Sequence, residues 1–109
     1  MANTFKLKTK ANVGVTTVGI YTAPASTTTV VIGITLSNTS GSGVNVGVGI
    51  TRAGTTEDIK LLKNAPLPQG SSLEFMARNK VVLEATDTLT VDSDTNNSVD
   101  AALTIMEIT

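Results

Sequence analysis

Aliphatic side chains fall on every second position between Val44 and Thr51, in the run Val-Asn-Val-Gly-Val-Gly-Ile-Thr. Successive strand residues point to opposite faces of a sheet, so this run has one apolar face and one small, polar face. Other stretches between Phe5 and Ile108 are also short and end in Gly, Asn, Ser or Pro, which close turns. The frequent β-branched residues, Thr, Val and Ile, favour strands over helices. The chain is therefore predicted to be all-β.

About eight strands are expected, with one further short strand at 80–83. They lie near 4–10, 13–21, 28–37, 44–52, 57–63, 71–76, 88–93 and 99–108. Turn-forming sequences separate them, among them 66–70 and 94–98. Short strands at this spacing are typical of a sandwich, a jelly roll or a small barrel. With 109 residues and no internal linker, residues 1–109 are expected to form one antiparallel β-sandwich domain, jelly-roll-like or immunoglobulin-like.

The residue types that usually carry catalysis are scarce. The chain has no His and no Cys, so a serine nucleophile would lack its usual base, and neither disulfides nor thiolate metal sites can form. No Gly-rich phosphate-binding sequence followed by Lys-Ser or Lys-Thr occurs. The chain is therefore expected to be no enzyme, with no catalytic residues, no cofactor and no metal.

One short stretch has the opening of a calcium-binding loop, because Asp92, Asp94 and Asn96 stand at the spacing of its first ligands. The match fails at the sixth position, where Asn97 replaces Gly, and at the twelfth, where Leu103 replaces a bidentate Glu. A polar hairpin whose Asp and Asn side chains close turns explains the same residues. The hairpin is the prediction, and bound calcium is the alternative.

The net charge of −1 conceals an uneven distribution. Residues 1–80 carry eight basic and three acidic side chains, a balance of +5, whereas residues 81–109 carry six acidic and no basic side chains. Solvated faces whose opposite signs compensate within the folded domain explain this split. Attraction between the two parts, either within one subunit or between neighbours, is the alternative. Little other positive charge or aromatic surface supports nucleic-acid binding. No apolar run approaches the ~20 residues that span a bilayer. The start of the sequence, residues 1–6, has no apolar stretch after a basic end, so no secretory signal is expected.

Two features predict contact surfaces between subunits. Lys6, Lys8 and Lys10 would line one face of the first strand and dock electrostatically, and this strand or the acidic C-terminal strand would supply an edge contact. Gly47 and Gly49 line the small face of their strand, where close subunit packing is expected, although a bulge or simple curvature explains them equally well. The apolar run 30–34 is expected in a strand covered on both faces, at the domain centre or under a neighbour.

Aromatic residues are limited to Phe5, Tyr21 and Phe75. Phe5 would lie opposite the lysines on the first strand, and both phenylalanines are expected to anchor the core. Tyr21 is expected to be a core ring with its hydroxyl at the rim. The alternative, a carbohydrate-binding β-sandwich module, requires an exposed aromatic platform, for which Tyr21 is the candidate.

Three stretches resemble small all-β virion proteins of tailed bacteriophages. They are residues 31–38 (VIGITLSN), 63–74 (KNAPLPQGSSLE) and 80–91 (KVVLEATDTLTV). In such proteins a strand ending in Asn leads to a variable loop, a Pro-x-Gly turn precedes a paired strand, and a leucine is followed by an acidic turn. Thr86 stands where Gly often precedes the Asp of that last turn.

The resemblance implies a virion structural protein, most simply a capsid decoration or cement protein that binds the assembled particle. A tail, neck, baseplate or fibre accessory protein is the alternative. The implied partners are further copies of the chain (a homo-oligomer such as a trimer) and other virion proteins such as the major capsid protein, with no nucleic acid and no membrane. The implied location is the virion, after synthesis and assembly in the host cytoplasm.

Overall fold

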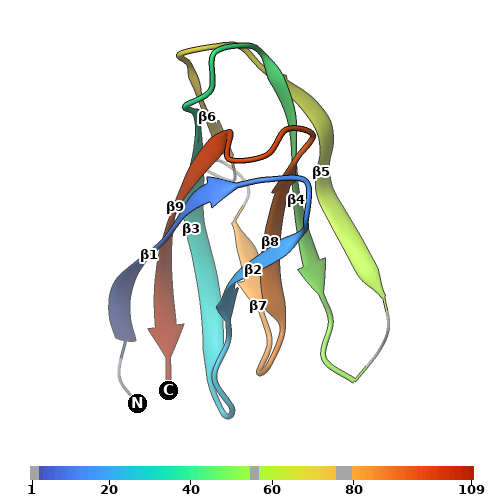
Figure 1. Ribbon diagram of the computed structural model, residues 1–109. Helices are drawn as coiled ribbons and strands as arrows, with labels where there is room; N and C mark the ends of the chain where they lie inside the picture. The colour runs from blue at the N-terminus through green and yellow to red at the C-terminus, as the bar shows by residue number, and fades with distance from the viewer. Residues whose placement is uncertain (1–2, 55–56, 76–79) are drawn as a thin grey trace.

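The computed structural model describes residues 3–54, 57–75 and 80–109. Within these residues nine strands form two antiparallel sheets that pack face to face, and no helix is present (Figure 1). Sheet A contains, in order, β1 (Asn3–Val13), β9 (Val99–Ile108), β3 (Thr28–Asn38) and β6 (Ser72–Phe75), and β7 (Val81–Leu83) also pairs with β3. Sheet B contains β2 (Val18–Thr22), β8 (Thr88–Ser93), β4 (Val44–Thr51) and β5 (Asp58–Leu67).

The first strand lies beside the last in one sheet, and the second lies beside the eighth in the other. This interleaving of strands from the two halves of the chain is the double Greek key of a jelly roll. The prediction of an all-β antiparallel sandwich is confirmed, in its jelly-roll-like form. Because Asn3 pairs with Ile108, the start of β1 and the end of β9 lie side by side (Figure 1).

The predicted strand boundaries differ most from the structure at two places. The strand expected at 13–21 is interrupted at 14–17, where the chain crosses from sheet A to sheet B. The turn expected at 66–70 begins later, because β5 continues through Pro66 to Leu67. β5 is an edge strand, so the missing N–H of a proline costs no ladder bond there. The turn is closed by the Ser71 N–H, which donates to the Pro68 carbonyl over 3.2 Å.

The core between the sheets is a thin aliphatic layer, as expected for two packed sheets. Its largest fully buried side chains are Ile34, Leu36, Leu83, Leu89, Leu103 and Ile105. Tyr21 is buried among them, and Phe75 is half-buried against the core. The prediction that Phe5 anchors the core is wrong, because this ring is 68% exposed on the edge strand β1.

β3 lies at the centre of sheet A, between β9 on one side and β6 and β7 on the other, as its apolar sequence predicts. Val31 and Ile34 on its inner face are buried, whereas Val30 on its outer face is only half-buried. A single chain therefore covers one face of this apolar strand fully and the other face only in part.

Candidate assembly surface

An apolar row crosses the outer face of sheet A, the face directed away from the core. Phe5 on β1 pairs with Met106 on β9, which pairs with Val30 on β3, which pairs with Val82 on β7. Directly opposed residues project from the same face of a sheet, so these four side chains are neighbours. Phe5 is 68% and Val82 is 55% exposed.

The alternation of β1 is inverted relative to an ordinary edge strand. Its apolar residues Phe5 and Leu7, the latter 65% exposed, point outward, whereas its lysines lie on the core-facing side. A shift of one residue in register would exchange the two faces. The observed register therefore presents apolar side chains to the surroundings, and contiguous exposed apolar surface of this kind marks interaction sites.

The register of β1 is accompanied by a polar network at the edge of the core. Lys6 Nζ lies 2.9 Å from Oε1 of Glu107, whose side chain is 8% exposed. The Tyr21 hydroxyl donates to Glu107 Oε2 over 2.6 Å and lies 2.8 Å from Thr29 Oγ1. Tyr21 is thus a core ring whose hydroxyl lies at the edge of the core, and Glu107 and Thr29 bury that hydroxyl. It offers no stacking platform to a sugar.

The same network shifts the pKa values of Glu107 and Tyr21. Hydrogen bonds from Lys6 and Tyr21 hold the pKa of Glu107 below its usual range, against the opposing effect of burial. Burial, together with the hydrogen bond to the Glu107 carboxylate, raises the pKa of Tyr21 to about 12. Glu107 is therefore a charged group kept inside the protein by a cation that the edge strand supplies.

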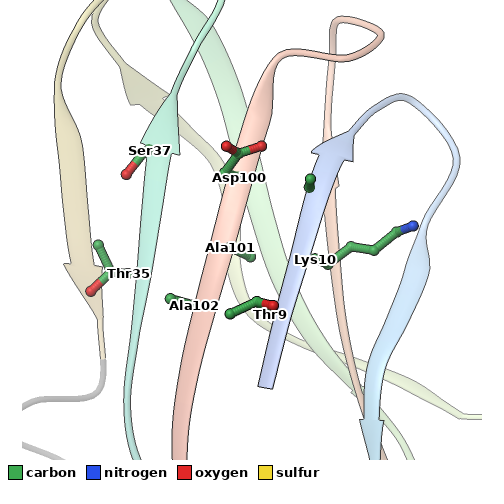
Figure 2. Close-up of a pocket in the computed structure, with 8 residues that line it drawn as sticks. Thr9, Lys10, Thr35, Ser37, Asp100, Ala101 and Ala102 are labelled. Carbon is green, nitrogen blue, oxygen red and sulfur yellow. The ribbon is translucent and has the colours of Figure 1, made fainter. Parts of the chain in front are cut away.

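Further along β1 the outer face is hollowed. A hollow of about 270 Å³ opens over β1, β9 and β3, lined by Thr9, Lys10, Ala11, Thr35, Ser37, Asp100, Ala101 and Ala102. Figure 2 shows the Asp100 carboxylate, Thr35 and Ser37 around it, with the Lys10 side chain directed away from Asp100. Apart from Lys10 and Asp100, its lining side chains are small.

The three lysines predicted to dock electrostatically differ in their surroundings. Lys6 is paired with Glu107, as described above. Lys8 and Lys10 have no ion-pair partner among the described residues; Lys8 is half-buried and Lys10 is exposed. Lys8 and Lys10 are therefore the members of this set that remain available for a neighbour.

Gly47 and Gly49 are surrounded by the chain's own strands. A methyl group at Gly47 would collide with the Asp92 carboxylate, and one at Gly49 would lie 2.8 Å from the Ile59 carbonyl oxygen. The pairing of β4 with β5 shifts register at these positions, so the bulge considered from the sequence is present. These contacts explain both glycines without a second subunit, and subunit packing at Gly47 and Gly49 stays a prediction.

The uneven charge distribution is matched within the subunit. Four ion pairs between described residues each join a basic residue of the first 80 to an acidic residue of the last 29. They are Lys6–Glu107, Arg52–Glu84, Arg52–Asp87 and Lys60–Asp92. The attraction considered from the sequence therefore acts between strands of one chain.

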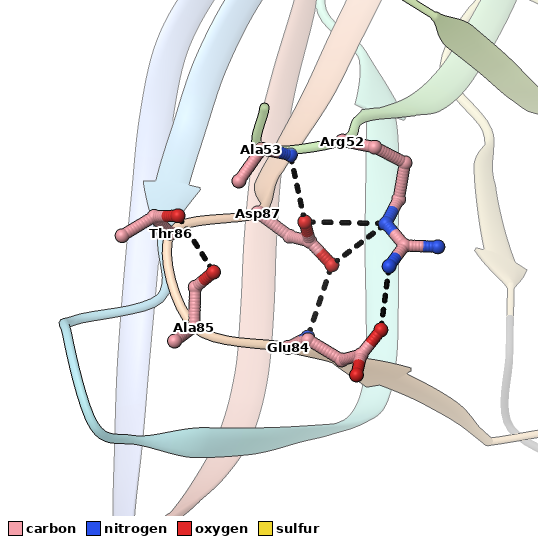
Figure 3. Close-up of polar contacts among 6 residues, drawn as sticks. All are labelled: Arg52, Ala53, Glu84, Ala85, Thr86 and Asp87. Atoms are coloured by element: carbon pink, nitrogen blue, oxygen red, sulfur yellow. Dashed lines mark hydrogen bonds and ion pairs between the residues drawn. The ribbon is translucent and has the colours of Figure 1, made fainter. Parts of the chain in front are cut away.

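Asp87 organises the corner where β7 leads into β8 (Figure 3). Its carboxylate accepts the Ala53 N–H over 3.0 Å and the Glu84 N–H over 3.0 Å, and Arg52 Nε lies 3.1 Å from it. Burial opposes the charge, but these donors outweigh burial and hold the pKa of Asp87 below its usual range. Thr86 beside it adopts a φ of 67°, the left-handed conformation that glycine would adopt without strain.

The oxygens of the calcium-like stretch serve other strands. Asp92 accepts a hydrogen bond from Thr17 Oγ1 over 3.1 Å, and Asp94 accepts one from the Asn45 N–H over 3.1 Å. The predicted polar hairpin is wrong, because β8 lies in sheet B and β9 in sheet A, so residues 94–98 cross between the sheets and do not join paired strands. Over the described ranges, no three carboxylates gather as a metal site, and no helix is long and apolar enough to cross a membrane.

Comparison with known proteins identifies the fold. No protein-family model matches the chain, and no curated protein matches it. Among solved structures, a subunit of Bacillus endospore appendages, described as disulfide-linked pili, matches with a TM-score of 0.59 at 15% identity, over 99% of this chain and 87% of that chain. The capsid of Helicobacter pylori bacteriophage KHP30 matches with a TM-score of 0.58 at 11% identity, over 98% and 87%.

A protein of infectious bursal disease virus, Gx strain, matches with a TM-score of 0.53 at 13% identity, over 95% of this chain and 32% of that chain. At these identities the likeness shows a shared fold. The jelly roll of this chain is thus one that also occurs in capsid and pilus proteins.

Proposed function

We propose that this chain is a non-enzymatic structural protein of a bacteriophage virion, and that it decorates the capsid. The fold likeness to the bacteriophage KHP30 capsid and to the endospore pilus supports a structural role. The pili are described as disulfide-linked, and this chain has no cysteine, so it cannot form such links. This difference favours a capsid over a covalently linked fibre.

The observation that carries the proposal is the outward direction of Phe5 and Leu7, both more than 60% exposed, at one end of the row that continues through Met106. A chain that functions alone gains nothing from an edge strand whose apolar side chains face water. A subunit that is built into a particle buries them against a neighbour. The outer face of sheet A is therefore the proposed contact with the particle.

The proposed partners are other copies of the chain, with a trimer as the proposed oligomer, and the major capsid protein. Lys8 and Lys10 lie on the other face of β1 from Phe5 and Leu7, outside this contact. They would meet an acidic surface of a further neighbour, because neither has an ion-pair partner within the described part of the chain. Lys6 serves Glu107 instead. The proposed location is the virion, after synthesis and assembly in the host cytoplasm.

Two other roles remain as alternatives to the capsid surface. A tail, neck, baseplate or fibre position would use the same outer face of sheet A. A sugar-binding role is less well supported, because Tyr21 is buried and the exposed ring of Phe5 has Met106 and Leu7 as its neighbours on the outer face, which are apolar and cannot hold sugar hydroxyls.

Immunogold labelling of purified virions tests the proposal. Antibodies raised against the chain are applied to virions from the phage that encodes it, and the gold particles are located by electron microscopy. Label over the head supports capsid decoration, and label confined to the tail, neck or baseplate supports the alternative. Virions without label, from preparations in which the chain is detected only in the supernatant, would contradict a structural role.

A further inference from the structure

Strand β1 is attached to the sandwich by few side-chain contacts. None of residues 3–12 is buried. Among the described residues, Val13, which is 1% exposed, is the first that is buried. Residues 3–10, here called the arm, are attached mainly by the backbone ladder to β9 and by the Lys6–Glu107 ion pair. An element with so little buried apolar surface can detach without opening the core.

A natural hinge separates the arm from the rest of the chain. The register shifts between Lys10 and Val13, and Asn12 adopts a φ of 59° while its N–H donates to Asp100 Oδ1 over 3.0 Å. Immediately beyond, the Val13 carbonyl accepts the Ser98 N–H over 3.1 Å. A change of φ and ψ at residues 11–12 would redirect the arm, while Val13 stays bonded to Ser98.

When the arm detaches, two groups of β9 lose their partners. The edge of β9 loses its ladder partner, and Glu107, 8% exposed, loses the cation that faces it. A buried carboxylate without a counter-charge is strongly unfavourable. The incoming segment must therefore be a strand that fits the β9 register and carries a cationic side chain opposite Ile105, where Lys6 lies in the closed chain.

We propose that the arm is exchanged between copies, so that residues 3–10 of one copy pair with β9 of the next. The arm of a second copy meets both requirements, since it restores the same ladder and the same ion pair with Glu107. Exchange of an identical element is a low-cost route to assembly. The inference rests on the proposed role as an assembling subunit, and it names the link between neighbouring copies.

Engineered thiols distinguish the closed from the exchanged arm. The chain has no cysteine, so Thr9→Cys with Ala102→Cys places one thiol on the arm opposite one on β9. The matched control, Thr35→Cys with Ala102→Cys, uses the same position on β9 but pairs it with β3, which is not exchanged. Both variants are treated with a short bis-maleimide at a concentration where light scattering shows oligomers, and are then separated on denaturing gels.

Exchange predicts covalent dimers and larger species for the arm variant and monomers for the control. Oligomers in which both variants are crosslinked within single chains would overturn exchange and leave the proposed virion role intact. A chain that is monomeric by light scattering at every concentration would also overturn it, and the immunogold result then decides the virion role separately. If the arm variant fails to fold by circular dichroism, Leu7→Cys with Thr104→Cys tests the next outward-facing pair.

Discussion

Lys6 on the edge strand β1 and Glu107 on β9 form an ion pair of 2.9 Å in which the carboxylate is 8% and the lysine 42% exposed. The lysine comes from a strand with no buried residue before Val13, and the acid also binds Tyr21 at the margin of the core. The buried Glu107 carboxylate therefore has its cation only while the edge strand β1 is in place.

Replacing Lys6 by Met should destabilise the protein by about 1–2 kcal/mol, because Glu107 then keeps its charge without a cation. Urea unfolding at pH 7 measures the change in the free energy of unfolding. Lys8→Met is the matched control, since Lys8 lies on the same face of β1 without an ion-pair partner among the described residues. Its expected effect is within about 0.5 kcal/mol. Equal effects of the two substitutions would contradict a specific role for Lys6.

Tyr21 is the only tyrosine, so the tyrosinate absorbance of the protein reports this residue alone. Its midpoint in the folded protein should lie at about 12. Because the folded pKa exceeds the unfolded value of about 10, the contribution of Tyr21 to stability is fully present below pH 10 and is lost as the pH rises toward 12. Glu107→Gln should lower the Tyr21 midpoint while burial keeps it above 10. A midpoint near 10 in the folded wild-type protein would contradict the buried hydroxyl.

Thr86→Gly should stabilise the protein by about 1 kcal/mol, because a β-branched residue at a φ of 67° is strained and glycine is not. Thermal and urea unfolding measure the gain. Thr104→Gly is the control, since Thr104 is exposed within β9 and glycine weakens an extended strand. The two substitutions should thus have opposite signs, and a loss of stability in Thr86→Gly would show that the turn carries no such strain.

Asp87→Ala should destabilise the protein by about 2–4 kcal/mol, because two backbone N–H groups and the Arg52 guanidinium lose their shared acceptor. Glu84→Ala is the control at the same corner. Its side chain pairs with Arg52 but is 72% exposed, so its loss should cost no more than about 1 kcal/mol. Urea unfolding of both variants gives the comparison, and a similar small loss in each would rule out Asp87 as the organiser of the corner.

Much of the fold follows from local sequence. Period-2 alternation in residues 44–51 and the apolar run 30–34 predict strands that the structure contains, and the β-branched composition predicts their class. The prediction of a turn at Pro66 was wrong because β5 is an edge strand, which tolerates proline where a central strand does not. Which strand lies at an edge depends on the order of all the strands and cannot be inferred from the local sequence.

The candidate surface could be predicted only in part. The alternation of β1 separates Phe5 and Leu7 from the lysines correctly, but it cannot say which face meets the core. Residue type suggested a buried Phe5, and the pairing with β9 placed it outside. The Lys6–Glu107 contact spans 101 positions along the chain, and only its opposite charges were visible in the sequence.

Incorporation of a variant subunit into virions tests the outer face of sheet A most directly. A phage that lacks this protein is complemented with the wild-type protein, with the double variant Phe5→Thr plus Leu7→Thr, or with Val15→Thr. Quantitative mass spectrometry then counts the copies bound to purified virions. Val15 is 55% exposed and lies outside sheet A, so its substitution controls for the loss of exposed apolar surface in general. If the outer face of sheet A contacts the particle, Val15→Thr is incorporated normally and the double variant is lost from the virions, while the thermal stability of both proteins is unchanged. Full incorporation of the folded double variant would contradict that contact.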